Sequence, residues 1–286
     1  MLRSRVLGVG SYAPPRVVTN DDLREMMDTS DEWIRQRTGI EQRHWVDDGT
    51  CTSDLALEAS RRALASAGVD KDELDLIVLA TLSPDHEFPG TACFLQAKLD
   101  RPGIPALDLR QQCTGFVYGM AVADSFVRTG QYGHVLVVGA EVHSKGLDKT
   151  PRGRDVGVLF GDGAGAVVMG PCEVDDPVRE SHVLSTHLHA DGRHASLLWM
   201  KAPGMDNGPT YLDQGTLDRA EHYPSMDGRR VYVNAVKRMP EAVHEALQAH
   251  GLQLEDVDLF LFHQANLRIN EAVAQALQAP PEKVFN

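Results

Sequence analysis

Two residues in the 286-residue chain have side chains and positions suited to covalent catalysis. The first is Cys113, which stands between the strand pattern "PALDLRQQ" and an apolar helix pattern, with Gly115 available for a tight turn. A thiol at the start of a helix is favoured as thiolate by the helix dipole, and open α/β sheets place their sites at the carboxyl ends of strands. The same position also suits a small buried cysteine without a chemical role, because free cysteines are among the residues most often buried.

The second residue is His263, which ends the apolar strand pattern "DLFLF" and begins "HQANLRIN". With polar Gln264 and Asn266 beside it, it is placed for acid–base or oxyanion chemistry. The alternative is a solvated histidine in a turn. A cysteine and a histidine at the ends of two related strands could meet at one site.

The elements that would position these residues recur along the chain. "ALASAGVDKDELDLIVLA" (63–80) and "ALQAHGLQLEDVDLFLFH" (246–263) align without a gap. Each has the end of an amphipathic helix, a glycine, an acidic connection and an apolar strand that suits a parallel sheet covered on both faces. The repeat predicts two similar α/β halves, which we assign to residues 1–171 and 172–286.

The second half looks shorter than the first. After Ala80 the first half continues through two helix patterns and three strand patterns. After His263 only the helix pattern "LRINEAVAQALQ" and the start of a strand remain. We therefore expect the second half to be incomplete at "EKVFN" and the chain to be a fragment.

Local signals place the other elements. "VLGVGSYAP" predicts an opening strand, and "TSDEWIRQRTG" predicts a capped helix that stops at Gly39. "CTSDLALEASRRALASAG" predicts a long helix that starts at Thr52 or Ser53. The stretch 191–227, rich in Gly, Pro and Asn, predicts a loop-rich insertion.

Composition limits the partners. A net charge of −13 argues against a nucleic-acid binder and against an anionic membrane surface. No apolar run is long enough to span a membrane, and the N-terminus does not have the pattern of a secretory signal. The four cysteines show neither CxxC nor metal-ligand spacing, which favours a reducing cytosol.

Three other motifs are given structural interpretations. "GDGAGA" lacks the strand-to-helix context of a dinucleotide or phosphate loop, so its glycines are assigned to a turn and close strand packing. His187 and His189 alternate onto one face of an expected strand with His194 nearby, and we expect a polar strand edge, not a metal site. The acidic connection Asp72–Asp75 is interpreted as solvated charge.

The motif set resembles the 3-oxoacyl-acyl-carrier-protein synthase III family of the thiolase superfamily. It comprises strand-Cys-x-Gly-Phe, "RGRDVGVLFGDGAGAVVMG", "STHLHADG", "FHQANLRI" and "TSDEWIRQRTGI", spread over nearly the whole chain. The resemblance implies a thiolase-like α/β fold of two similar halves in a five-layered α-β-α-β-α arrangement. It also implies decarboxylative condensation of an acyl-CoA primer with malonyl-acyl-carrier protein, without a metal or a further cofactor.

The resemblance assigns the two reactive residues their roles. Cys113 would carry the acyl group as a thioester, and the ring N–H of His263 would bind the enolate oxygen that forms when the malonyl group loses carbon dioxide. A thiolate is both nucleophile and leaving group, and an enolate needs neutral hydrogen-bond donors. The family shares the second duty with an asparagine in a "GNT" motif, which is not found before Asn286.

Further residues match the family's coenzyme A site. Trp33, Arg37 and Arg152 match residues that hold the adenine and the phosphates, in keeping with stacking and forked arginine bonding. Trp33 and Arg37 are also spaced for simple packing on one helix face, since they are four residues apart. Four more residues match positions that line the family's pantetheine tunnel, although the motifs around them are less specific: Thr29, Gly228, Tyr232 and Asn266.

Other matches concern partners. Phe88 in "HEFPG" matches a residue that crosses the family's dimer interface to close the acyl pocket, which implies a homodimer. Arg268 matches a docking arginine for the acidic carrier protein. Val233 departs from a second docking position, although Arg229 and Arg230 lie nearby in sequence.

Gln111 and Gln112 also depart from the family pattern, because these positions beside the cysteine are usually small. They could reshape the acyl pocket, so the sequence leaves open an acetyl-primed housekeeping enzyme and a specialised relative. The sequence also allows two alternative functions. One is an inactive fragment or binding module that lacks the asparagine, and the other is a cysteine hydrolase that uses Cys113 and His263.

Overall fold

The computed structural model describes residues 1–177 and 179–286, and these residues divide into two compact units. Unit 1 comprises residues 1–17, 44–143 and 161–188, and unit 2 comprises residues 18–43, 144–160 and 189–286. Each unit buries apolar side chains of its own. None of the helices in the described chain combines the length and the apolar character needed to cross a membrane.

Unit 1 is built on a five-stranded mixed sheet in the order β1-β7-β6-β4-β5. Along the chain its elements are β1 (Leu2–Tyr12), α3 (Thr52–Ala67), β4 (Leu74–Ala80), α4 (Thr91–Lys98), β5 (Ala106–Leu109), α5 (Gly115–Arg128), β6 (His134–Glu141) and β7 (Gly163–Glu173). Strands β5, β4 and β6 are parallel, β7 is antiparallel to β6, and β1 is antiparallel to β7. The opening strand, the helix ending at Gly68 and the strand over "HVLVVGAE" were all predicted from the sequence.

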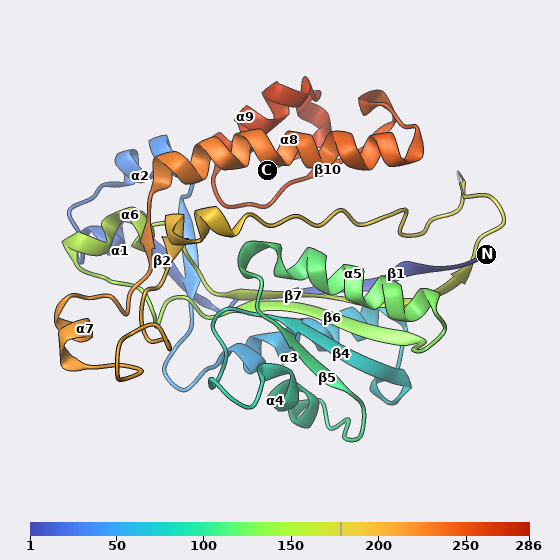
Figure 1. Cartoon of the computed structure of the whole chain (residues 1–286), viewed down its shortest axis with the longest axis horizontal. Helices are drawn as coiled ribbons and strands as arrows, with labels where there is room; N and C mark the ends of the chain where they lie inside the picture. The colour runs from blue at the N-terminus through green and yellow to red at the C-terminus, as the bar shows by residue number, and fades with distance from the viewer. Residues whose placement is uncertain (178) are drawn as a thin grey trace. The chain divides into compact units, whose positions relative to one another are not determined.

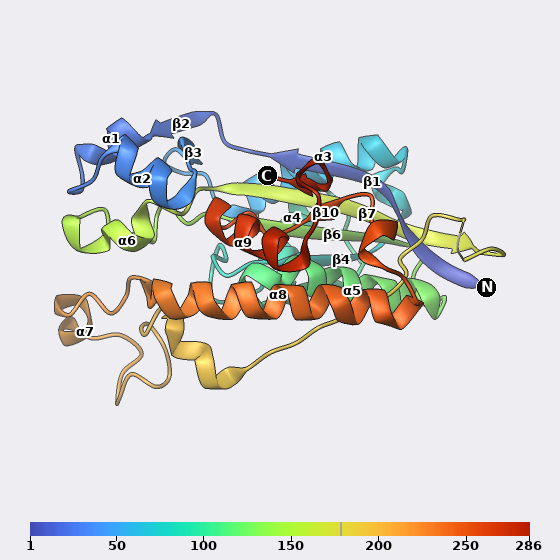
Figure 2. The same ribbon diagram turned by 90° about the horizontal axis from the view of Figure 1, so that it is seen from above.

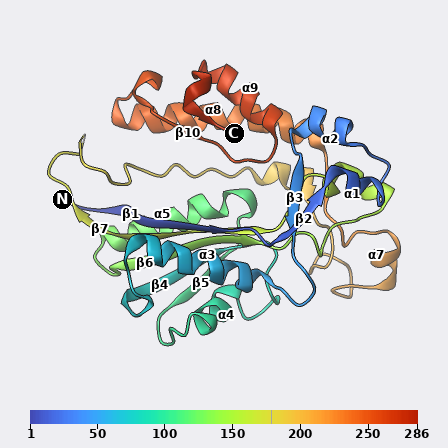
Figure 3. The ribbon, with the colours of Figure 1, turned by 180° about the vertical axis from the view of Figure 1, so that it is seen from behind.

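Helices cover both faces of this sheet, with α5 on one side and α3 and α4 on the other (Figures 1 and 3). Successive side chains of β4 therefore enter two different cores. Ile77 and Leu79 pack in the core under α3 and α4, whereas Leu76 and Val78 pack in the core under α5. This explains why the strand has an almost unbroken apolar sequence, as parallel strands with two covered faces do.

The register of the sheet brings three strand ends together. Ala80 pairs with Leu109 of β5 on one side and with Gly139 of β6 on the other. The segments that follow these residues therefore leave the sheet at the same edge, as expected for parallel neighbours. Cys113 comes just after β5 and Glu141 ends β6 at that edge.

Unit 2 contains shorter strands and one long helix, α8, which runs across the view in Figure 2. Its complete elements are α1 (Asn20–Arg24), α2 (Asp31–Thr38), α6 (Arg154–Gly157), β8 (Leu198–Trp199), α7 (Gln214–Asp218), β9 (Ser225–Met226), α8 (Gly228–His250), β10 (Phe260–Leu261), α9 (Leu267–Leu277) and β11 (Val284–Phe285). β10 is parallel to β11, and apolar residues of α8, α9 and β10 share one core. The strands β2 (Arg16–Thr19) and β3 (Gln42–Trp45) form a separate two-stranded sheet.

The sequence repeat is confirmed in local structure. α3 ends at Gly68 and α8 at Gly251, both with left-handed backbone at φ 66°. A short 3-10 turn follows at matching positions, Lys71–Glu73 in one case and Leu254–Asp256 in the other, before β4 and β10. Glycine tolerates this backbone without the strain that a side chain would cause, so it ends both helices.

One local prediction was confirmed and another was wrong. Helix α3 starts at Thr52, as predicted, and Cys51 precedes it as the N-cap residue, whose N–H donates to the Asp54 carboxylate at 2.9 Å. The carboxylate three residues into the helix takes over the capping role. The stretch around His187 and His189 forms no strand, because its backbone finds no neighbouring strand with which to pair.

Candidate functional site

Cys113 lies where the sequence predicted, in a turn between a strand and a helix. It is the central residue of the 3-10 turn Gln112–Thr114, between β5 and α5. Its side chain is exposed, so the small buried cysteine considered as the alternative is not what the fold contains. The thiol is accessible at the edge where β4, β5 and β6 end.

The turn is built differently from the prediction, in which Gly115 supplied the tight bend. The left-handed residue is Gln112, at φ 37°, while Gly115 has an ordinary helical φ of −54°. Gly115 is needed for space, because a Cβ there would lie 2.9 Å from the Cβ of Ala80. A non-glycine residue with left-handed backbone is strained, and such strain gathers at functional sites.

The pKa of the Cys113 thiol is raised, which is opposite to the effect expected from the helix N-terminus. Desolvation by the surrounding protein is the main cause, and the negative charge of Glu141 adds to it. Protein atoms around the thiol remove part of its solvation although the residue is exposed. Both effects disfavour the thiolate.

Glu141 is fixed by the turn that follows β4. Its carboxylate accepts hydrogen bonds from the hydroxyl of Thr81 at 3.1 Å, from the N–H of Leu82 at 3.0 Å, and from the N–H and hydroxyl of Ser83 at 3.1 and 2.5 Å. Charge-assisted bonds of this kind hold a carboxylate in one orientation. A fixed negative charge therefore stands at the edge of the sheet that also carries Cys113.

A histidine also occupies this edge. His143 lies two residues beyond β6, and burial lowers its pKa while the charges of Glu141 and Asp162 oppose that shift. Asp162 in turn accepts the N–H of Val46 at 2.7 Å. The sequence analysis assigned no role to Glu141 or His143, although a charged residue at the end of an apolar strand was the same signal that pointed to His263.

His263 belongs to unit 2, where it follows β10 by two residues. Desolvation lowers its pKa below the ordinary value for histidine. The imidazole is therefore neutral at physiological pH, and a neutral imidazole carries one N–H donor. This is the protonation state that the predicted oxyanion role requires.

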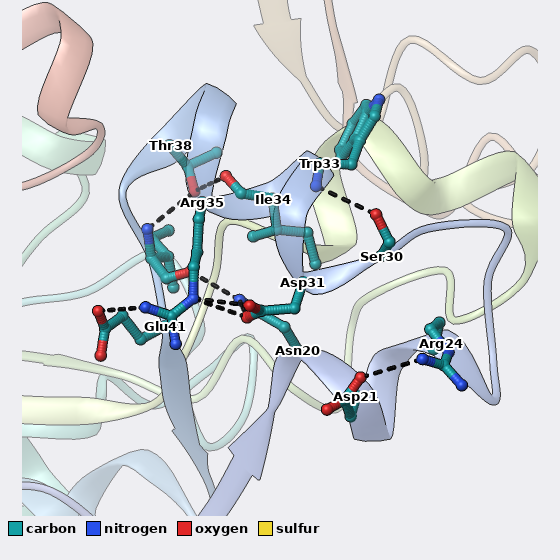
Figure 4. A network of polar contacts seen from close by, with 11 residues as sticks. Asn20, Asp21, Arg24, Ser30, Asp31, Trp33, Ile34, Arg35, Thr38 and Glu41 are labelled. Atoms are coloured by element: carbon teal, nitrogen blue, oxygen red, sulfur yellow. Dashed lines mark hydrogen bonds and ion pairs between the residues drawn. The ribbon is translucent and has the colours of Figure 1, made fainter.

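A second candidate site in unit 2 surrounds Trp33. The indole is half-buried on α2, whose N-terminus is capped by Ser30, and it points away from the Asp31–Arg35–Glu41 network (Figure 4). The Arg37 guanidinium lies 4.4 Å from the ring centroid and that of Arg154 lies 4.7 Å from it. Both distances are within the range of cation–π attraction.

The sequence resemblance pointed to Arg152, not Arg154, as the arginine of this region. Arg152 is ion-paired with Asp148 at 2.6 Å, and its guanidinium lies 5.9 Å from the ring of Tyr223. The structure thus brings Trp33 and Arg37 together as predicted and adds Arg154 to them. The only sequence signal for Arg154 was its place two residues after Arg152 in "TPRGR".

The four residues matched to the pantetheine tunnel all lie in unit 2. Asn266 caps α9 and donates to the carbonyl of Arg37 at 3.3 Å. Gly228 and Tyr232 are on the first turns of α8 and are exposed. Among the described residues, the hydroxyl of Thr29 is buried and has no hydrogen-bond partner.

The residues matched to partner surfaces are exposed. Phe88 in unit 1 is 86% exposed, a large value for an apolar side chain. Arg268 lies on the first turn of α9, and Val233 and Arg229 lie on α8. In residues 1–177 and 179–286, no group of three or more His, Cys, Asp or Glu side chains could hold a metal ion.

Comparisons with known proteins agree with this geometry. The family model described as 3-oxoacyl-[acyl-carrier-protein] synthase III matches residues 107–192, and the model of its C-terminal part matches residues 247–286. The chain is 48% identical over 287 residues to beta-ketoacyl-[acyl-carrier-protein] synthase III of Rhodospirillum rubrum, and the match covers 100% of this chain and 85% of that protein. The chain belongs to this family.

Solved structures support the same family and its fold. The crystal structure of 3-oxoacyl-(acyl carrier protein) synthase III from Pseudomonas aeruginosa is 40% identical and superimposes with a TM-score of 0.86, covering 99% of this chain and 82% of that one. The crystal structure of the enzyme from Aquifex aeolicus is also 40% identical and has a TM-score of 0.85. The match covers 99% of this chain and 83% of that chain. The predicted thiolase-like α/β fold is confirmed.

Membership of the family also fixes the class of reaction. The protein is an acyltransferase that condenses an acyl-CoA primer with malonyl-acyl-carrier protein, in fatty-acid biosynthesis. The predicted enzyme class is confirmed by these matches.

Proposed function

We propose that Cys113 carries the growing chain's first acyl group. The Cys113 sulfur attacks the thioester carbonyl of the acyl-CoA primer, the bond from that carbonyl to the coenzyme A sulfur breaks, and the thiol proton passes to the departing coenzyme A. The exposed thiol at the junction of β5 and α5 is the observation that supports this role. The raised pKa means that the proton must leave during attack, not before it.

The condensation step is assigned to His263. Malonyl-acyl-carrier protein loses carbon dioxide to give an enolate, and the neutral ring N–H of His263 donates a hydrogen bond to the enolate oxygen. The enolate carbon then attacks the acyl-Cys113 carbonyl, the bond from that carbonyl to the Cys113 sulfur breaks, and the released thiolate takes up a proton from solvent to regenerate the thiol. The lowered pKa supports this role, since it keeps the imidazole neutral with one N–H donor for the developing charge.

Coenzyme A is assigned to the residues around Trp33. Adenine stacks on the indole, and Arg37 and Arg152 bind phosphates. Pantetheine then runs past Thr29, Gly228, Tyr232 and Asn266. The buried, unpartnered hydroxyl of Thr29 and the guanidinium on Trp33 support this assignment.

The remaining proposals concern architecture and partners. Residues 1–171 and 172–286 form the two related halves, which the repeated helix–glycine–turn–strand structure supports. The enzyme acts in the cytoplasm as a homodimer in which Phe88 closes the partner's acyl pocket. Arg268 docks the carrier protein, and no metal or cofactor beyond acyl-CoA takes part.

The test is acylation followed by condensation. The protein is incubated with acetyl-CoA and longer acyl-CoAs and its intact mass is recorded, and then malonyl-acyl-carrier protein is added and the 3-oxoacyl product is measured. We expect one acyl adduct, on Cys113, in the wild type and in Cys93→Ala, a control at another exposed cysteine. The absence of an adduct on Cys113, or product formation by Cys113→Ala, contradicts the proposal.

A further inference from the structure

Trp33 is held by two arginines from different helices. Arg37 reaches the indole from the same helix, α2, while Arg154 reaches it from α6. A second guanidinium is not needed to bury the ring, because Arg37 already lies 4.4 Å from its centroid. Two cations near one ring also repel each other, so an anion between them would relieve an unfavourable arrangement.

The orientation of Arg154 is set by the backbone. Its Nη1 donates to the carbonyl of Asp28 at 3.0 Å, and its Nε lies 3.5 Å from the Asp155 carboxylate, which is itself 75% exposed. In the described chain no protein acceptor is bonded to Nη2. The guanidinium is therefore held by the Asp28 carbonyl, the indole and one long contact with an exposed carboxylate, which leaves Nη2 able to donate to a ligand.

The charges nearby are only partly balanced. Arg152 pairs with the buried Asp148, and the guanidinium of Arg37 has no carboxylate partner among the described residues. Beside the Trp33 ring, Arg37 is therefore unpaired among the described residues and Arg154 is paired only with the exposed Asp155, so positive charge is in excess there, in a chain whose net charge is −13. A ligand that matches this site combines an aromatic base with several phosphates.

Coenzyme A has three phosphates in two places. Two form the 5′-diphosphate that leads to pantetheine, and the third is a 3′-phosphate on the ribose, close to the adenine. A cation that lies on the ring where the base stacks is positioned for the phosphate nearest the base. We propose that Arg154 is a specificity-determining residue that binds the 3′-phosphate and so selects coenzyme A over its 3′-dephosphorylated form.

This inference rests on the proposed coenzyme A site and extends it by one residue and one phosphate. The test is a binding measurement on Cys113→Ala protein, which needs no turnover. Calorimetric titration gives Kd for coenzyme A and for dephospho-coenzyme A in three backgrounds: the unaltered site, Arg154→Met and Arg24→Met. Arg24 is a matched control, since it is an arginine of unit 2 that is 62% exposed and pairs with Asp21.

We expect the unaltered site and Arg24→Met to bind coenzyme A about tenfold or more tightly than dephospho-coenzyme A, as the loss of one charge-assisted bond implies. Arg154→Met should weaken coenzyme A binding to the level of the dephospho form, whose own Kd stays the same. If Arg154→Met does not fold, Arg154→Gln keeps a donor for the Asp28 carbonyl, and the same result is expected.

Three results would overturn the inference. One is equal weakening of both ligands, which assigns Arg154 to packing of Trp33. The second is an unaltered site that does not distinguish the ligands, and the third is a site that binds neither of them. The first two leave the proposed function intact, and failure of acylation at Cys113 leaves the binding result intact, so the two failures are distinguishable.

Discussion

The first turn of α5 rests directly on the last residue of β4, so that a Cβ at Gly115 would lie 2.9 Å from the Cβ of Ala80. The Cβ of Ala80 is fixed by the backbone of its strand, and Gly115 is fixed in the first turn of a helix. Neither can shift without a cost in free energy. We expect Gly115→Ala to shift the turn that carries Cys113, lower stability by about 1–3 kcal/mol and slow acylation. Urea unfolding and the rate of adduct formation from acetyl-CoA measure the two effects.

Gly165→Ala is the matched control for this change. It adds the same methyl group in β7, where a Cβ would meet no atom within 4 Å. It should leave both stability and acylation close to those of the wild type. Equal effects of the two substitutions would show that close packing on Ala80 does not position Cys113.

The ionisation of Cys113 gives a second prediction. Because desolvation and Glu141 raise its pKa above the ordinary thiol value, its alkylation by iodoacetamide should increase with pH and reach its midpoint above pH 9.0. Glu141→Gln removes a negative charge and should move that midpoint to lower pH. Peptide mass spectrometry separates Cys113 from the other exposed cysteine, Cys93.

The control for this experiment is Glu87→Gln, an exposed carboxylate of unit 1 that pairs with Arg110. It should leave the Cys113 midpoint in place. A midpoint that Glu141→Gln leaves unchanged would mean that burial alone sets the thiol pKa.

Local sequence signals predicted much of this fold. The caps and glycine stops placed α2 and the ends of α3 and α8, and the apolar run predicted β6 from His134 to Glu141. These signals act within one or two turns of the chain, so a single sequence contains them. The strand pattern followed by an apolar helix pattern likewise placed Cys113 at the junction of β5 and α5.

The sequence did not predict features that depend on distant contacts. The left-handed backbone fell on Gln112 instead of a glycine, because the space at Gly115 is set by Ala80, thirty-odd residues earlier. The direction of the Cys113 pKa depends on Glu141, and the arginine on Trp33 depends on where α6 packs against α2. Such pairs become visible only once strands and helices are packed.

A buried arginine of unit 2 gives a third prediction. Arg43 is 5% exposed and donates to the carbonyls of Val18 at 3.3 Å and Val158 at 3.0 Å, and burial lowers its pKa to about 10. Arg43→Met fills similar space but removes the hydrogen bonds to both carbonyls, so it should destabilise the protein by about 1–3 kcal/mol. Urea unfolding beside Arg24→Met measures the difference, and equal stability of the two variants would show that these bonds contribute nothing.

The protonation state of His263 gives the last prediction. Desolvation lowers its pKa below 6.5, so the neutral form that donates to the enolate persists at neutral pH and is lost only as the pH falls through that lowered pKa. Decarboxylation of malonyl-acyl-carrier protein should therefore decline on the acid side with a midpoint below pH 6.5.

His263→Ala should lower the decarboxylation rate by about a hundred- to a thousandfold, the usual effect of removing one oxyanion donor, and should abolish the acid-side decline. Acylation of Cys113 by acyl-CoA should continue in this variant, because that step is assigned to the thiol of unit 1. Adduct formation by intact mass and carbon dioxide release measure the two steps separately. Loss of acylation together with decarboxylation would place His263 in the first step as well, and a midpoint above pH 6.5 would mean that the imidazole is stabilised in its charged form.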